Sequence, residues 1–235
     1  MTERMKYSFA SWRSAGLGLL LTVLPLLAGA QQAVPPTPFL AVKAVPQYVV
    51  QSGYWVEVER GLSRHPRHSI TLTPQLYWGP AGRPNLVNYV SADRNESVRG
   101  AGLEVRHRYY LRAAKAAYPT GWYVSYGPTF QYFRMAYSTL GWREVKNPDE
   151  LPHYEYGYIP SATTHISRFG AAAVLGYQAP LPPGRVFLDV YAGLGLRYTH
   201  NQSEVVAAQF RSGRSDYGHR GFYFPMGVKV GIVLR

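Results

Sequence analysis

The C-terminal segment from residue 222 to residue 235 alternates between two kinds of side chain. Its odd positions are mostly small or polar, whereas its even positions form an unbroken apolar row: Phe222, Phe224, Met226, Val228, Val230, Ile232 and Leu234. Successive side chains of a β-strand point to opposite faces, so one face of this segment is wholly apolar. The row is long enough to cross a hydrocarbon layer as a tilted strand. A soluble sheet edge with this face would aggregate, whereas a closed barrel in lipid would not, so the segment predicts a transmembrane β-strand.

The N-terminal end has the order of a secretory signal. Basic residues come first, an apolar run follows at 15–27, and Ala28-Gly29-Ala30 offers a small-residue cleavage site. The alternative is a transmembrane anchor, but Pro25 interrupts the run, which falls short of the roughly 20 residues that an anchor needs. We therefore expect a Sec-type signal peptide over residues 1–30, cleaved near Ala30. A proline-rich lead-in at 31–38 and one domain over 39–235 follow.

Composition narrows the class of protein and its partners. The sequence has no cysteine, which excludes disulfides and thiolate metal sites. The full chain has a net charge of +12, and loss of three basic residues and one acid with the signal would leave +10. In an exported chain this charge predicts attraction to anionic lipid head groups or surface glycans rather than to nucleic acid. Twenty tyrosines and five tryptophans suit aromatic girdles at two membrane interfaces. Our candidates for the girdles are Trp78, Trp122, Tyr132, Tyr177, Tyr198 and Phe222.

Period-two alternation recurs in eight segments, which predicts an all-β, eight-stranded, antiparallel, up-and-down transmembrane β-barrel. The segments lie near 39–46, 53–61, 69–79, 98–112, 121–136, 165–178, 185–200 and 220–235. The connections are sorted by length: those at 62–68, 113–120 and 179–184 are short, those at 80–97, 137–164 and 201–219 are long, and the one at 47–52 is modest. If both termini are periplasmic, the short turns are periplasmic and the long loops extracellular, as in transmembrane barrels. The expected location is the bacterial outer membrane.

The same alternation places most charges of the strands on the inner face. They are Glu57, Glu59, Glu104, Arg106, Arg108, Asp189, Arg197 and Lys229, with Lys43 and Arg168 as further candidates. An eight-stranded barrel is just wide enough for side chains to fill it, and buried charges must pair. A packed ionic network is therefore the expected interior. The functional alternatives are a narrow ion path, which would make the protein porin-like, or an acid/base pair at Glu57 and Glu59.

In architecture, residues 37–235 resemble the small eight-stranded outer-membrane barrels, the group of outer membrane proteins A and X. A more specific resemblance lies in the segment from Tyr54 to Arg64 with the strand at 69–77, which is similar to the opening of barrel families of unknown function. The resemblance implies an embedded scaffold with exposed loops and no cofactor. Its partners would be outer-membrane lipid, lipopolysaccharide and the outer-membrane assembly machinery, which reads an aromatic last residue in such families. This chain departs from that pattern, since it ends in Arg235.

One constellation has catalytic potential. His165 and Ser167 share a face of the sixth segment and resemble the histidine-x-serine pair of the outer-membrane lipid A deacylases. A serine nucleophile needs a base within reach and an acid that orients the base. Here the neighbouring acid, Asp189, has inward parity, and Arg168 replaces the asparagine that usually follows the serine. The pair therefore supports only the alternative interpretation, that of a lipid A-modifying serine hydrolase.

The leading prediction for function is a non-enzymatic scaffold whose extracellular loops bind a surface partner, and a narrow small-solute channel is a further alternative. The longest predicted loop, 137–164, contains Trp142, Tyr154, Tyr156 and Tyr158, which suit contact with a glycan or protein ligand. No phosphate loop or dinucleotide fingerprint is present, so no cofactor is expected. The histidines at 65, 68 and 107 do not have the spacing of a metal site, and no metal is expected.

Overall fold

The structure of the protein is a computed structural model, which describes residues 39–63, 65–81, 96–111, 119–145, 151–182, 184–204 and 216–234. The elements are β1 (Leu40–Ala44), the 3-10 helix η2 (Pro46–Gln51), β2 (Gly53–Leu62), β3 (His65–Pro80), β4 (Ser97–Tyr110), β5 (Gly121–Val145), β6 (His153–Leu181), β7 (Val186–Ser203), β8 (Gly221–Tyr223) and β9 (Met226–Val233). In these ranges no helix is long and apolar enough to cross a membrane. The predicted signal peptide, the lead-in and Arg235 lie outside the described residues.

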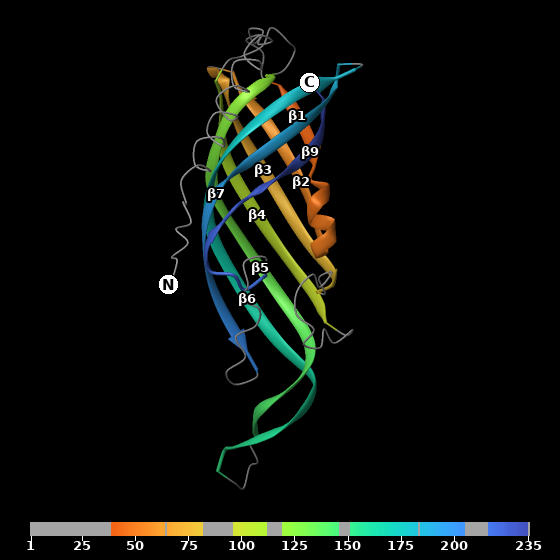
Figure 1. The fold of residues 1–235 in the computed structure, drawn as a ribbon, viewed down its shortest axis with the longest axis vertical. Coiled ribbons are helices and arrows are strands. Elements are labelled where there is room, and N and C mark those ends of the chain that lie inside the picture. Colours follow the sequence, from red (N-terminus) through yellow and green to blue (C-terminus); the bar gives the residue numbers. More distant parts are fainter. Residues whose placement is uncertain are drawn as a thin grey trace, which may run out of the picture.

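The strands form one antiparallel sheet that closes on itself in a ring (Figure 1). Each strand pairs with the next along the chain, and β1 pairs with β9 to close the ring. β8 and β9 are one strand interrupted at Phe224 and Pro225, because Gly195 pairs with Tyr223 and Ala192 with Met226 in the same register on β7. Pro225 has no amide hydrogen to donate to a neighbour. The predicted all-β, antiparallel arrangement of eight strands is thus confirmed.

Side chains alternate between the inside and the outside of the ring, because successive residues of a strand face opposite ways. On β3, Thr71 and Gln75 are at most 1% exposed, whereas Leu76 and Trp78 are 63% and 73% exposed. The apolar row that ends the sequence, from Phe222 to Leu234, lies on the exposed outer face along its whole length. The ring therefore has an apolar outside and a largely polar inside.

The main departure from the predicted strands is at 137–164, which we expected to be the longest loop. β5 and β6 instead continue through this region as a two-stranded hairpin, paired as far as Val145 and His153, and Figure 1 shows it projecting beyond the rest of the ring. Pro160 lies beside a register shift between Tyr137 and Thr139, where β5 is the one neighbour of β6 among the described strands. A proline is tolerated there because no second strand needs its amide hydrogen.

The two ends of the ring differ. The hairpin end carries the projecting part of β5 and β6. The terminal end is the opposite one, where β1 begins and β9 ends (Figure 1).

Candidate functional site

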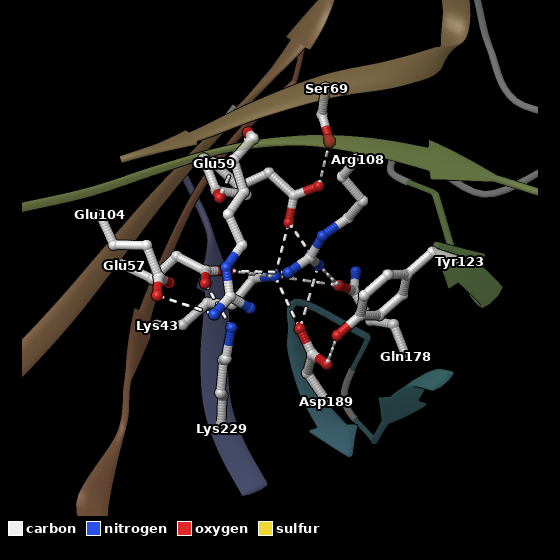
Figure 2. A network of polar contacts seen from close by, with 12 residues as sticks. Lys43, Glu57, Glu59, Ser69, Glu104, Arg108, Tyr123, Gln178, Asp189 and Lys229 are labelled. Carbon is white, nitrogen blue, oxygen red and sulfur yellow. Dashed lines mark hydrogen bonds and ion pairs between the residues drawn. The ribbon is translucent and has the colours of Figure 1, made fainter. Parts of the chain in front are cut away.

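The centre of the ring holds a buried ionic cluster built around Arg108 on β4 and Lys43 on β1 (Figure 2). The guanidinium of Arg108 donates to three carboxylates, at 2.9 Å in Glu57, 2.9 Å in Glu59 and 3.0 Å in Asp189. The ammonium of Lys43 contacts the same three, at 2.9, 2.5 and 2.8 Å respectively. All five side chains are at most 1% exposed. The salt bridges of the cluster thus link four strands: β1, β2, β4 and β7.

Further charges extend the cluster along the inside of the ring toward the hairpin end. Lys229 on β9 contacts the second carboxylate oxygen of Glu57, and Arg106 donates to Glu104 at 2.7 Å. Arg106 and Glu104 are each 5% exposed. Four cations thus stand beside four carboxylates, and the group is formally neutral. Neutrality matters here because a buried charge without a partner costs several kcal/mol.

Neutral polar groups complete the surroundings of the carboxylates. Ser69 and Tyr110 donate to Glu59 at 2.5 and 2.8 Å, and Tyr123 donates to Asp189. The Arg108 guanidinium also lies over the Tyr123 ring, 3.9 Å from its centroid. Because these side chains are packed together and buried, the cluster fills the ring at this level.

The structure brings seven of the eight predicted interior charges into this cluster and leaves out Arg197. Arg197 lies toward the hairpin end, with its guanidinium 3.5 Å from the centroid of the Tyr223 ring. Lys43, which sequence reasoning named only as a further candidate, occupies the centre instead. The two carboxylates proposed as an acid/base pair, Glu57 and Glu59, are both held by cations and are closed off from solvent.

The predicted girdle residues all lie on the outer face, and they lie at two levels. Trp122 and Tyr177 face each other near the terminal end, with ring centroids 5.3 Å apart. The others lie toward the hairpin end and are well exposed: Trp78 at 73%, Tyr132 at 41%, Tyr198 at 53% and Phe222 at 61%. Two aromatic levels therefore border the apolar outer face.

The candidate catalytic pair lies on the outer face near the hairpin end. Ser167 is directly opposite His200 on β7, a neighbour that sequence reasoning missed. His165 shares a hydrogen bond of 2.6 Å with the Tyr132 hydroxyl through its Nδ1. These side chains and Gln202 line a surface pocket of about 270 Å³. Within the described residues no hydrogen bond joins Ser167 to either histidine.

Asp189 faces inward, as its parity predicted, and lies in the ionic cluster. It is therefore on the opposite side of the sheet from Ser167 and His165, where it cannot orient the histidine. A serine triad needs an acid in that orienting position, and Asp189 does not supply it.

A second histidine group lies on the outer face near the terminal end. The Nδ1 of His68 and the Nε2 of His107 are 2.9 Å apart across β3 and β4, and the ring of His65 meets that of His68 edge to face. Sequence reasoning missed this pair, because it depends on the register between the two strands. No group of three or more metal-ligating side chains was found among the described residues.

Comparisons with known proteins add little to this geometry. No family model matches the chain, and no curated protein sequence matches it. Among solved structures, the chain is similar to a major outer membrane protein from Thermus thermophilus. The two are 11% identical, the match covers 84% of this chain and 98% of that chain, and the TM-score is 0.38. At that TM-score the similarity decides neither site nor function.

Proposed function

We propose that this protein is a transmembrane β-barrel of the bacterial outer membrane and that it is a non-enzymatic scaffold. The observation that carries this proposal is the apolar outer face bounded by aromatic residues at two levels. Trp122 and Tyr132 are ten residues apart on β5, which is about 33 Å along a strand and about 25 Å along the axis of a barrel whose strands tilt by about 40°. The apolar band of outer-membrane barrels has this height.

The test is heat-modifiability of the mature protein in detergent or lipid. A closed barrel that resists detergent migrates faster on a gel before boiling than after it, and its far-UV circular dichroism is that of a β protein. We expect both results. A protein that dissolves without detergent and shows no change in mobility on boiling would contradict the membrane assignment.

The ionic cluster favours a closed barrel over a channel. Small ions need a continuous wet path, whereas the side chains of Lys43, Arg108 and Asp189 are fully buried against one another. We expect no steady conductance when the purified protein is inserted into a planar bilayer at moderate voltage. A regular unit conductance would support the small-solute channel instead.

The projecting hairpin is our candidate for contact with a surface partner. One of its faces carries Trp142 on β5 and Tyr154, Tyr156 and Tyr158 on β6, each more than half exposed. Trp142 pairs with Tyr156, with ring centroids 5.3 Å apart. Rigid aromatic side chains provide large contact areas for glycan or protein ligands at low entropic cost.

Binding of the purified protein to a glycan array and to the surface proteins of neighbouring cells would test this role. Replacement of Trp142 and Tyr156 by alanine should abolish the signal. The matched control is Trp78→Ala, which removes an exposed tryptophan of the barrel wall and should leave the signal unchanged.

Lipid hydrolysis is the second candidate, favoured by the pocket in which Ser167 lies opposite His200 and beside His165. Lipid hydrolysis is the weaker of the two candidate functions, because Asp189 faces inward and cannot orient the histidine. Expression of the wild type and of Ser167→Ala, followed by mass spectrometry of lipid A, separates the two functions. Identical acylation with both proteins and with an empty vector would end the hydrolase proposal.

A further inference from the structure

A cavity of about 380 Å³ lies in the half of the ring nearer the hairpin end, separate from the ionic cluster. Its lining includes Arg168 and Arg197, which come from inside the ring, and also Phe222 and Met226, which are 61% and 63% exposed on the outer face. A cavity that touches both faces of a strand must pass around the edge of that strand. The cavity therefore opens sideways through the wall between η2 and the strand formed by β8 and β9.

The pairing of the strands explains this opening. β1 has only five residues, and it pairs with β9 from Val230 to Val233 alone. The stretch from Gly221 to Lys229 is paired with β7 on one side and has no described strand on the other. Pro46 begins η2 at this point, so the chain continues beside β2 as a helical turn rather than as a strand (Figure 1). The side chain of Gln47 packs against Gly227, which closes the part of the gap nearer the terminal end.

Arg168 on β6 is the first cation that lines the cavity. It is 5% exposed, and it donates to the Oε1 of Gln131 at 2.6 Å and to the backbone carbonyl of Tyr217 at 3.2 Å. A further contact of 3.4 Å reaches the backbone carbonyl of Asp216. All of these acceptors are neutral, so the positive charge of Arg168 is held in place without an ion pair in the described part of the chain.

Arg197 is the second cation of the cavity. Its guanidinium stacks on Tyr223, and its Nε is buried without a hydrogen-bond partner in the described residues. The acidic side chain among the lining residues is that of Asp216, so two cations stand against one carboxylate. The ionic cluster, which lies nearer the terminal end, is already balanced, and it supplies no spare acid. One buried and one partly buried guanidinium group, in excess of their counter-ions among the lining residues, are suited to a bound anion, especially a planar or tetrahedral oxyanion.

We propose that this cavity binds the anionic head group of a single-chain amphiphile, a carboxylate or a phosphate monoester, through Arg168 and Arg197. The alkyl chain leaves between η2 and β8 and lies along Phe224 and Met226 on the apolar outer face. Trp55 and Tyr77 line the inner part and supply apolar contact. The volume is at the lower end of the range for small-molecule sites, which suits one chain rather than two.

The experiment uses the mature protein in nanodiscs of zwitterionic phosphatidylcholine, with binding to empty discs subtracted. The probes are laurate, dodecyl phosphate and the uncharged dodecanol, each radiolabelled. We expect saturable binding of one anionic amphiphile per protein and at least about tenfold weaker binding of dodecanol. The ratio of laurate to dodecyl phosphate affinity identifies the preferred head group.

Two substitutions test the cations. Arg168→Gln and Arg197→Gln should each weaken anion binding by about tenfold or more, since each removes a charge-assisted hydrogen bond. The matched control is Arg220→Gln, which removes an exposed arginine that stacks on the outer residue Tyr198. It should bind as the wild type does. The proposal is overturned if the wild type binds no anion saturably, if dodecanol binds as tightly as laurate, or if Arg197→Gln is unaffected.

Heat-modifiability of each variant reports its folding separately. If the buried Arg168→Gln variant loses the mobility shift, Arg197→Gln alone decides, because Arg197 is only partly buried. The site rests on the membrane placement proposed above, and the mobility shift of the wild type tests that placement independently of ligand binding.

Discussion

Arg108 and Lys43 each contact three carboxylates of the ionic cluster, more than any other cation in it. Replacement of Arg108 by methionine removes one of these two cations. Its guanidinium bonds to Glu57, Glu59 and Asp189, and all four side chains are at most 1% exposed. In the variant, Lys43 and Lys229 remain to balance three acids, so one carboxylate keeps no cation of its own. Loss of one partner from a buried ion pair costs about 3–5 kcal/mol. We expect the free energy of unfolding to fall by about 4 kcal/mol.

The measurement is urea unfolding of the protein refolded into lipid vesicles, with the folded fraction read from the mobility of unheated samples on a gel. For a slope of about 2 kcal/mol per molar urea, a loss of about 4 kcal/mol lowers the midpoint by about 2 M. The control is Arg99→Met, because Arg99 is an exposed residue of the outer face of the same strand. Its midpoint should change by a few tenths of a molar at most.

A double-mutant cycle tests the reasoning behind this number. Glu59→Gln added to Arg108→Met restores the charge balance, because two cations then face Glu57 and Asp189. The new amide at position 59 would still accept hydrogen bonds from Ser69 and Tyr110, which now donate to the Glu59 carboxylate. We expect the two substitutions to be non-additive by about 1–3 kcal/mol in favour of the double variant. Strict additivity, or a loss below about 1 kcal/mol for Arg108→Met alone, would refute the ionic cluster as the source of stability.

Three further predictions concern the outer face, the hairpin and the candidate serine. Val228→Arg places a cation on the apolar outer face, which costs about 2–4 kcal/mol near a bilayer midplane. The folding yield of this variant in vesicles should therefore drop. The control variant Leu151→Arg, at an 88% exposed position, should fold normally. Replacement of residues 138–161 by Asn-Gly should preserve the heat-dependent mobility shift, because the ring pairs fully without them; loss of the shift would show that the hairpin is needed for closure. Ser167→Ala should leave the urea midpoint within about 0.5 M of the wild type, since the described structure shows no hydrogen bond to the Ser167 hydroxyl. A larger change would reveal a structural role.

Alternation predicted the strands and their faces well because it follows from backbone geometry alone. Side chains on a strand must alternate, and burial of one face selects which set is apolar. The hairpin at 137–164 escaped for a related reason. In its outer part, at 153–158, neither face is buried, so Tyr154, Tyr156 and Tyr158 alternate with residues that are not systematically polar, and Pro160 suggests a strand break. The register shift that accommodates Pro160 cannot be read from the sequence.

Parity predicts the face of a side chain but not its level along the ring, and this explains why Arg197 lies outside the ionic cluster. Arg197 and Asp189 share the inner face of β7, but they lie eight residues apart, or roughly 26 Å along the strand. Asp189 pairs with Lys229 across the register, whereas Arg197 pairs with Gly221 near the hairpin end. Register also explains the position of Lys43. It pairs with Glu57 on β2 and with Gly231 on β9, which places its side chain at the level of the ionic cluster. Which charges meet is decided by register, which the sequence does not state.

The short first strand divides the interior into two parts with different properties. Where β1 is present, the ring closes completely, and the balanced ionic cluster ties β1 to β2, β4 and β7. Beyond Ala44 the chain turns into η2, the wall loses a strand, and the interior contains Arg168 and Arg197 without a matching pair of acids among the lining residues. The ionic cluster and the proposed anion site therefore lie at different levels of one ring. Substitutions in the cluster should therefore change the unfolding midpoint, whereas substitutions of the two arginines should act mainly on anion binding.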